Sequence, residues 1–237
     1  MRVIIITLFP EIFSSLINYG VLSRAFSTQK VSLDFINPRD FVFDTHKTVD
    51  DRPFGGGPGM VMLAEPIAQS IEQAKKILPD ARVIYLSPQG KKFDQAMAEE
   101  LINLGEKSDF IFLCGRYEGV DQRVLDSLID FELSLGDFVL SGGELALMCI
   151  LDAMIRLIPG VLGDSQSALE DSFSVSLNNN RERVLDHPHY TRPPVWRGLP
   201  VPEVLLSGHH VNIQQWRREK ALEITQKKRP DLLKKIK

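Results

Sequence analysis

Four short glycine-containing segments could hold a small polar ligand. They are Ser87-Pro88-Gln89-Gly90, Gly115-Arg116-Tyr117-Glu118-Gly119, Gly136-Asp137 and Gly142-Gly143. They cluster at the predicted ends of β-rich runs, where parallel sheets leave backbone amides free and glycine lets a ligand approach them. We therefore predict that three or four of these loops cradle one ligand through backbone hydrogen bonds. Spacing alone fits ordinary turns and helix caps equally well.

A second glycine cluster runs from Thr48 to Met60. Four glycines and two prolines in this segment leave no scope for a helix or a strand. Because they stand beside Asp50, Asp51 and Arg52, they indicate backbone placed against a flat ligand such as a base. A solvent-exposed flexible loop is the alternative.

The sequence Asp186-His187-Pro188-His189 is the arrangement closest to a metal site. Two histidines two residues apart on a proline-containing loop give poor geometry for one tetrahedral ion. The pattern therefore favours contact with RNA or with another domain over metal binding, and simple loop packing also fits it.

The elements that must position these residues alternate between β-rich and helical periodicity. Apolar runs predict strands at Val3–Leu8, Val31–Ile36, Arg82–Leu86, Asp109–Cys114 and Phe131–Leu135, and a spacing near 3.6 predicts helices at Glu65–Leu78, Phe93–Leu104 and Val120–Ile129. Ser141-Gly142-Gly143-Glu144 fits a capping box that opens an apolar helix through Ile155. This alternation predicts an α/β fold with a mostly parallel sheet.

The remaining chain divides into a linker and a helical end. The polar stretch Gly163–Asn180 indicates a mobile linker. A helix containing Ile213, Trp216 and Arg217 is expected after Ser207-Gly208-His209-His210, and Pro230 can open a final one. We predict an α/β domain over 1–160, a flexible linker over 161–185 and a small basic helical domain over 186–237.

Composition excludes several classes of protein. The 237 residues carry 25% charged and 43% hydrophobic side chains, which is ordinary for a globular chain and excludes general disorder. No apolar run reaches the ~20 residues that span a membrane, and the first one lacks a signal-peptide cleavage site. Cys114 and Cys149, both in apolar context, are expected to be buried thiols in a reducing cytoplasm. The glycine patterns of Rossmann and P-loop nucleotide sites are absent.

Charge is unevenly distributed along the chain. Residues 209–237 hold nine Lys/Arg against three Asp/Glu, whereas the first 208 hold 19 against 28. A basic end on an acidic body is typical of contact with a polyanion, although a solvated helical face gives the same count.

Taken together, these segments resemble the bacterial tRNA (guanine-37-N1) methyltransferases of the SPOUT superfamily. The matching motifs are Thr7-Leu-Phe-Pro-Glu-Ile-Phe13, Asp50–Met60, Leu86–Gly90, Cys114–Asp121, Gly136-Asp137 with Ser141–Glu144, Ile158–Leu162 and His189–Pro193. They follow the family order over nearly the whole chain. The resemblance implies a trefoil-knotted α/β domain that binds S-adenosylmethionine, a C-terminal α-helical domain that binds tRNA, and a homodimer with composite active sites. Periodicity alone argues against a knot, because true knots are rare.

The resemblance also implies the residues of the site. The cofactor contacts it assigns are Tyr85, Leu86, Ser87, Pro88, Gln89, Gly90, Gly115, Tyr117, Glu118, Gly119, Leu135, Gly136, Asp137, Phe138, Val139, Leu140, Gly142 and Gly143. The substrate contacts are Asp50, Gly59, Met60, Ser172 and Asp186. Glu118 either holds the cofactor or helps to bind Mg²⁺, and no metal ligand set follows from the sequence.

By the same resemblance, Asp171 is the general base and Arg156 the cation that stabilises charge on O6 of guanine. Taken without the family, Arg156 fits a cation at a helix C-terminus and Asp171 a carboxylate that caps a turn. The segment Ser174–Val184 is longer than the family pattern and the chain ends soon after Leu233. Both departures bear on the RNA contacts of the C-terminal domain.

Two other functions are compatible with parts of this pattern. A SPOUT enzyme acting on ribosomal RNA would share the cofactor loops, but a ribose methylase would need no carboxylate at a base edge. A non-enzymatic RNA-binding module would explain the basic end and leave the glycine loops, Asp171 and Arg156 without a role.

Overall fold

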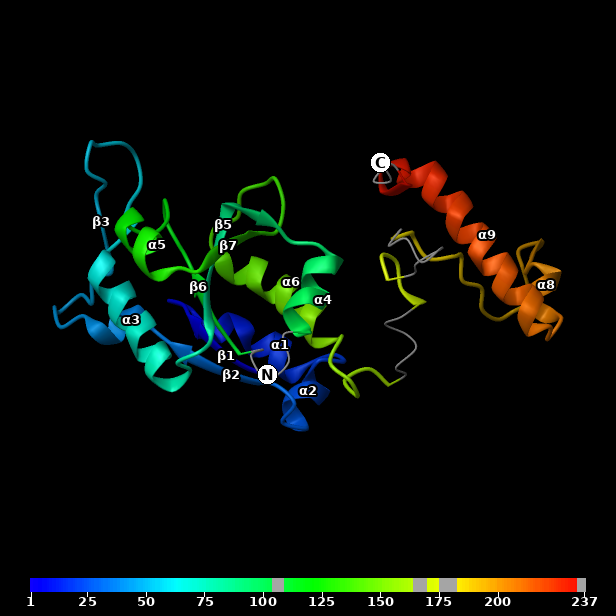
Figure 1. The fold of residues 1–237 in the computed structure, drawn as a ribbon, viewed down its shortest axis with the longest axis horizontal. Helices are drawn as coiled ribbons and strands as arrows, with labels where there is room; N and C mark the ends of the chain where they lie inside the picture. The colour runs from blue at the N-terminus through cyan, green and yellow to red at the C-terminus, as the bar shows by residue number, and fades with distance from the viewer. Residues whose placement is uncertain (104–108, 164–169, 175–182, 234–237) are drawn as a thin grey trace. The chain divides into compact units, whose positions relative to one another are not determined.

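The computed structural model describes residues 1–103, 109–163, 170–174 and 183–233. The chain forms two compact units, Met1–Gly163 and Asp164–Lys237 (Figure 1). Most of the predicted linker 161–185 lies outside the described residues. No helix in the described part of the chain is long and apolar enough to cross a membrane.

A five-stranded parallel sheet forms the centre of the first unit. Its strands are β1 (Arg2–Ile6), β2 (Ser32–Ile36), β5 (Arg82–Lys92), β6 (Phe110–Cys114) and β7 (Phe131–Ser134), in the order β2-β1-β6-β5-β7. All five residues of β6 are buried, as expected for a central strand that is covered on both faces. The α/β class with a parallel sheet is therefore confirmed.

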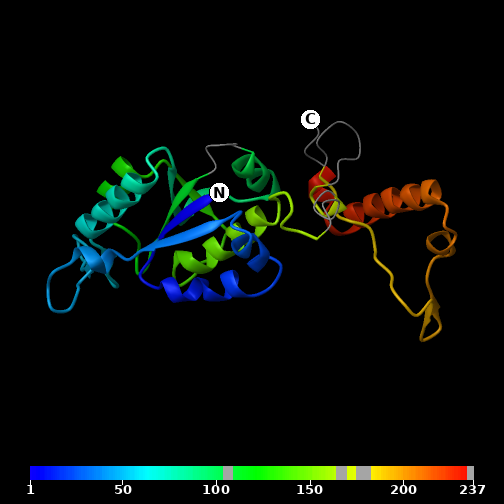
Figure 2. The same cartoon turned by 90° about the horizontal axis from the view of Figure 1, so that it is seen from below.

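Helices cover both faces of this sheet (Figure 2). Alternate side chains of β6 divide between two cores: Phe110 and Phe112 belong to one, Ile111 and Leu113 to the other. The first core includes α1 (Ser14–Asn18), α2 (Ser23–Ser27), α4 (Gln95–Ile102) and α6 (Gly143–Ile155). The 3₁₀ turn η1 (Pro10–Phe13) directly precedes α1. The second includes α3 (Ala64–Ile77) and α5 (Gln122–Leu128). This layering follows from the period of two along each strand.

The loop Thr48–Met60 contains more regular structure than its composition predicts. Asp50–Asp51 form β3, which pairs antiparallel with β4 (Val61–Met62). The glycines and prolines lie between these two strands, so the segment is a hairpin whose composition reflects its turn. A further short 3₁₀ turn, η2 (Pro38–Phe41), precedes it.

Two other predictions about the first unit were wrong. Cys149 is exposed, because it lies on the face of α6 that the sheet does not cover; Cys114 is buried as expected. The N-cap of α6 is Gly142, without a side-chain cap, so the capping box at Ser141 does not form. The Glu144 carboxylate instead turns inward and accepts a hydrogen bond from the Thr7 hydroxyl at 2.8 Å.

The second unit contains the predicted helix as α9 (His210–Lys228). Before it come a two-stranded hairpin, β8 (Val195–Trp196) and β9 (Leu199–Pro200), and the short helix α8 (Glu203–Leu206); Pro230 opens the 3₁₀ turn η4 (Pro230–Leu233). The buried hydroxyl of Thr225 on α9 accepts a hydrogen bond from the Leu185 amide at 2.9 Å. This bond fixes the segment around residue 185 to the long helix.

The long strand β5 depends on a glycine. The predicted strand ended at Leu86, but β5 continues to Lys92 and its pairing with β7 changes register between Leu86 and Lys91. At Gly90 the two backbones are so close that a Cβ atom would lie 2.5 Å from the backbone of Glu132. Only a residue without a side chain fits there.

We therefore predict that Gly90→Ala lowers the free energy of unfolding by about 1–3 kcal/mol, because the added methyl group forces β5 and β7 apart. Urea unfolding followed by circular dichroism measures this. Gly163→Ala is the control, since a Cβ there meets nothing within 4 Å. Equal urea midpoints for the two variants would contradict the prediction.

Candidate active site

One cavity of about 270 Å³ lies where residues 85–88 of β5 meet the carboxyl ends of β6 and β7. The loops that follow β6 and β7 and the first turn of α6 line the rest of it. This is where open parallel sheets bind ligands, because backbone groups there are not used by the sheet. The cavity size is near the lower end of small-molecule sites, ~300 Å³.

The structure brings most of the predicted cofactor residues to this cavity. Those that line it are Tyr85, Leu86, Ser87, Pro88, Gly115, Tyr117, Glu118, Gly119, Leu135, Gly136, Phe138, Val139, Leu140, Gly142 and Gly143. Gln89, Gly90 and Asp137 do not line it. Asp137 is directed to Lys92, with their charged atoms 3.6 Å apart, and Gly90 contacts β7.

Four lining residues were not predicted: Arg116, Leu133, Ser134 and Ala146. Arg116 stands inside the glycine loop of residues 115–119 and could have been included on that ground. Leu133 and Ser134 belong to β7, and the sequence gives no sign that the end of this strand faces a ligand.

Tyr85 forms the floor of the glycine loop. A Cβ on Gly115 would lie 2.7 Å from the Tyr85 hydroxyl oxygen, and one on Gly119 would lie 3.4 Å from it. Burial raises the pKa of Tyr85 to about 12, with a further contribution from the negative charge of Glu132. The phenol is therefore neutral and serves as a rigid packing surface under the loop.

The predicted base-contacting residues lie beside this loop. Burial raises the pKa of Tyr117, and the nearby negative charge of Asp50 raises it further. The Glu118 amide donates to the Met60 carbonyl at 2.9 Å. A Cβ at Gly59 would meet the Glu118 carboxylate, which would have to move. The predicted base contacts at Asp50, Gly59 and Met60 therefore lie beside the cavity-lining loop but do not line the cavity themselves.

Arg156 does not line this cavity. It is the C-cap of α6, whereas Gly142 and Gly143 of the cavity stand at the opposite end of the same helix. At 1.5 Å per residue the separation along the helix is ~20 Å, further than an arginine side chain reaches. Within one chain, Arg156 and the cavity are therefore separate.

The other predicted catalytic and substrate residues gather in the second unit. The Asp186 amide donates to the Ser172 hydroxyl at 2.9 Å, and the Phe173 amide donates to the Val184 carbonyl at 2.8 Å. These bonds hold the turn containing Asp171 and Ser172 beside Asp186. Val184 is fully buried, so the pair of segments rests on an apolar contact.

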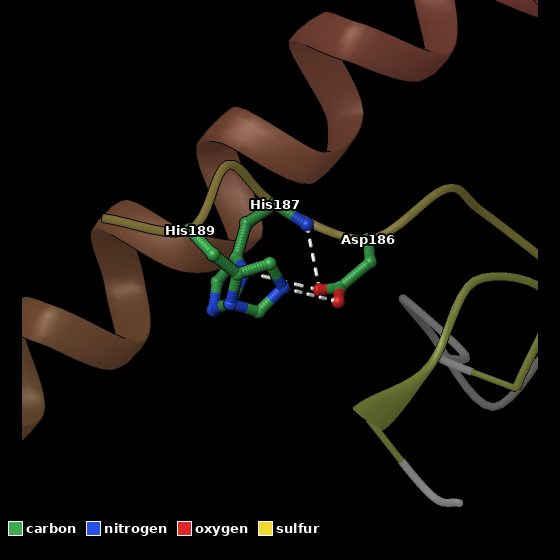
Figure 3. Close-up of side chains that lie close together, drawn as sticks. All are labelled: Asp186, His187 and His189. Carbon is green, nitrogen blue, oxygen red and sulfur yellow. Dashed lines mark hydrogen bonds and ion pairs between the residues drawn. The ribbon is translucent and has the colours of Figure 1, made fainter. Parts of the chain in front are cut away.

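Asp186 is shared by two imidazole rings (Figure 3). His189 Nε2 lies 2.7 Å from Asp186 Oδ2. His187 Nδ1 lies 3.0 Å from Asp186 Oδ1, but the angle of this contact does not allow a hydrogen bond. One possible metal-ligand atom from each of Asp186, His187 and His189 lies within 4.8 Å of the other two, a closer grouping than the sequence spacing predicts. Among the described residues, no other group of three or more His, Cys, Asp or Glu side chains could hold a metal ion. The His189 ring and the His187 backbone amide, which donates to Asp186 Oδ1 at 2.6 Å, hold the Asp186 side chain in one orientation.

Comparison with known proteins covers almost the entire chain. A family model described as tRNA (Guanine-1)-methyltransferase TrmD matches residues 1–235. A protein of Herminiimonas arsenicoxydans named tRNA (guanine-N(1)-)-methyltransferase is 53% identical over 98% of this chain and 92% of its own length. Proteins with the same name from Janthinobacterium sp. (strain Marseille) and Marinomonas sp. (strain MWYL1) are 52% and 53% identical, again over 98% of this chain and over 92% and 89% of their own lengths.

The raised pKa of Tyr85 makes stability depend on pH in a defined direction. Above pH 10 the unfolded chain releases a phenolic proton that the folded chain keeps until about pH 12, so the free energy of unfolding falls as pH rises between these values. Tyr85→Phe should remove up to about 3 kcal/mol of this fall. Urea unfolding across the interval measures it.

Tyr19→Phe is the control for this experiment, because Tyr19 is 75% exposed. The ultraviolet phenolate signal that Tyr85→Phe removes should titrate near pH 12. If the signal that Tyr85→Phe removes were instead centred near pH 10, Tyr85 would not be held neutral by burial.

Proposed function

Because the chain belongs to the tRNA (guanine-1)-methyltransferase family, we propose that it transfers a methyl group from S-adenosylmethionine to N1 of guanine 37, next to the anticodon of tRNA. The observation that carries this proposal is the cavity between the middle of β5 and the carboxyl ends of β6 and β7. The loops that the family uses for its cofactor line it, apart from Gln89, Gly90 and Asp137. The match over residues 1–235 supports the same reaction class.

The cavity residues fit S-adenosylmethionine. The Tyr85 ring at Gly115 and the Cys114 backbone at Gly143 leave no room for side chains at these two positions, so backbone groups border the cavity there. Leu86, Leu135 and Leu140 supply apolar contacts for an adenine ring, and Glu118 supplies a carboxylate. When bound, S-adenosylmethionine supplies a methyl group activated by its sulfonium.

The proposed role of Mg²⁺ rests on Glu118 alone. Among the described residues, no group of three protein ligands forms around Glu118. An Mg²⁺ ion at this carboxylate would take its other oxygens from water or from substrate, as Mg²⁺ commonly does.

Asp171 and Arg156 have complementary roles in this proposal. N1 of guanine must lose its proton, and Asp171 is the base that accepts it. The negative charge that develops on O6 is stabilised by the guanidinium of Arg156. Asp186, held by His187 and His189, and Ser172 contact the target guanine, while Asp50, Gly59 and Met60 contact its neighbour.

A homodimer reconciles these roles with the length of α6. Since Arg156 and the cavity stand at opposite ends of this helix, we propose that Arg156 and Asp171 enter the cavity of the partner protomer. The exposed apolar surface supports this. Val139 is 88% exposed and Leu145 is 51% exposed, and Cys149 lies one turn beyond Leu145. Large apolar side chains exposed beside a site are typical of protein interfaces.

The proposal also includes the trefoil knot of the SPOUT fold in residues 1–160 and a tRNA-binding domain in residues 186–237, joined by the linker 161–185. The parallel sheet is compatible with this knot. The basic α9 supports the RNA contact, because phosphates attract Lys and Arg independently of base sequence.

Asp171→Asn tests the chemistry. It keeps the side-chain shape but removes the basic oxygen, so single-turnover methylation of unmodified tRNA should fall by roughly 10²-fold or more. Calorimetric affinity for S-adenosylmethionine should not change. Near wild-type turnover at neutral pH would exclude Asp171 as the base.

The same variant tests the shared site when it is mixed with Gly143→Val, whose side chain would push the first turn of α6 away from β6 and so disrupt the cavity wall. Circular dichroism and the dimer mass verify that this variant still folds and dimerises. Random mixing should restore about a quarter of wild-type activity, because half of the dimers are mixed and each has one intact composite site. If Asp171 instead served its own protomer, no mixture of the two inactive variants would recover activity.

Lys227→Gln/Lys228→Gln tests the RNA contact. These residues stand in the last turn of α9, and Lys75 and Lys76 stand in the last turn of α3, which makes Lys75→Gln/Lys76→Gln a matched control. The α9 variant should bind tRNA more weakly, and its plot of log Kd against log[salt] should be shallower by about 1–2. A slope equal to that of the control would assign these lysines to a solvated face.

A further inference from the structure

Glu144 is a fully buried carboxylate at the start of α6, and the proposed chemistry does not use it. Its Oε1 accepts the Thr7 hydroxyl hydrogen bond at 2.8 Å, and Thr7 Oγ1 in turn accepts from the Phe9 amide at 3.0 Å. A charge in such a place is costly unless it is paired. Glu144 therefore needs a cation.

Arg116 supplies that cation. Its Nε lies 3.0 Å from Glu144 Oε2, so the two side chains form an ion pair. The contact is not a hydrogen bond, because the N–H does not point at the oxygen. The same guanidinium donates to the Ser141 carbonyl at 3.2 Å and stacks over the Phe9 ring at 4.5 Å from its centre. The Arg116 side chain, 20% exposed, is thus held on three sides.

This pair joins two walls of the cavity. Arg116 forms an isolated β-bridge with Gly142, and the Gly143 amide donates to the Gly115 carbonyl at 3.0 Å. Gly142 touches both charged side chains so closely that a Cβ would collide with them. The ion pair therefore lies where the loop after β6 meets the first turn of α6.

The loop that it holds has an unfavourable backbone conformation. Tyr117 has φ +59°, a left-handed conformation that non-glycine residues rarely adopt, and Gly119 has φ +120°. Such conformations persist only where the surroundings fix them. Backbone hydrogen bonds from Glu118 to Met60 and from Gly119 to Arg116 help to fix this conformation. The Glu144–Arg116 ion pair holds the residue just before Tyr117.

We propose that Glu144 is a positioning residue: through Arg116 it fixes the loop 115–119 in the shape that binds S-adenosylmethionine. The inference rests on the proposed function only for the identity of the ligand. Loss of the carboxylate frees the Arg116 guanidinium, and the loop then samples conformations in which Tyr117 and Glu118 no longer line the cavity.

Three variants test this role: Glu144→Gln, the uncharged pair Glu144→Gln/Arg116→Gln, and Glu65→Gln as a control at an exposed carboxylate on α3. The double variant matters because Glu144→Gln alone leaves a charge without its partner and can fail to fold. Hydrogen exchange of the amides in residues 115–119 is measured without ligand, and S-adenosylmethionine affinity by calorimetry.

In both Glu144 variants these amides should exchange severalfold faster than in wild type, and S-adenosylmethionine should bind about tenfold more weakly. The double variant should bind it no more weakly than the single variant, because the two residues act as one unit. Glu65→Gln should match wild type. If the double variant regained wild-type exchange and affinity, the pair would serve only to neutralise two buried charges, and the proposal would be wrong. A wild-type protein that does not bind S-adenosylmethionine would overturn the proposed function, whereas the exchange result would still decide the role of Glu144.

Discussion

The close approach of backbones at the carboxyl ends of the parallel strands is the constraint on which the cavity depends. At Gly143 a Cβ atom would lie 2.9 Å from the Cα atom of Cys114, so the first turn of α6 can rest directly on the end of β6. A side chain there would lift α6 from the sheet and open the wall between Gly115 and Gly142. The sheet, its helices and the buried Tyr85 all serve to keep these loops at contact distance.

The length of α6 sets a second condition. One end of this helix borders the cavity and the other carries Arg156, so a single chain does not bring the cavity and this cation together. In our proposal a second copy of the chain supplies what the first lacks, and the exposed apolar residues beside the cavity become the interface. Catalysis and dimerisation would then depend on the same surface.

The parallel sheet and most helices could be predicted from periodicity, because strands buried on both faces are continuous apolar runs and amphipathic helices repeat every turn. Glu144 shows where such reasoning stops. Its position after Ser141-Gly142-Gly143 fits a capping box locally, yet its carboxylate bonds Thr7 and Arg116, which are distant in sequence. Pairing across the fold overrides a local preference, and one sequence does not reveal it.

The four glycine segments, and their meeting around one ligand, could be predicted from their places at the ends of β-rich runs, although the same spacing fits ordinary turns. Their assignment to a cofactor came from the resemblance to a family, and periodicity does not give the strand order that brings them together. The separation of Arg156 from that cavity also required the structure. Asp171 and Ser172 stand beside Asp186 because a short pair of backbone segments rests on α9.

In the proposed dimer, the cavity of one protomer holds the methyl donor while the other protomer supplies the proton acceptor. The most direct measurement is a crystal structure of the dimer bound to unmodified tRNA and sinefungin, an unreactive analogue of S-adenosylmethionine. The analogue should lie between the loops of Gly115 and Gly142, with Asp171 of the partner subunit beside N1 of guanine 37. An analogue bound elsewhere, or a guanine approached by Asp171 of the same chain, would contradict this arrangement.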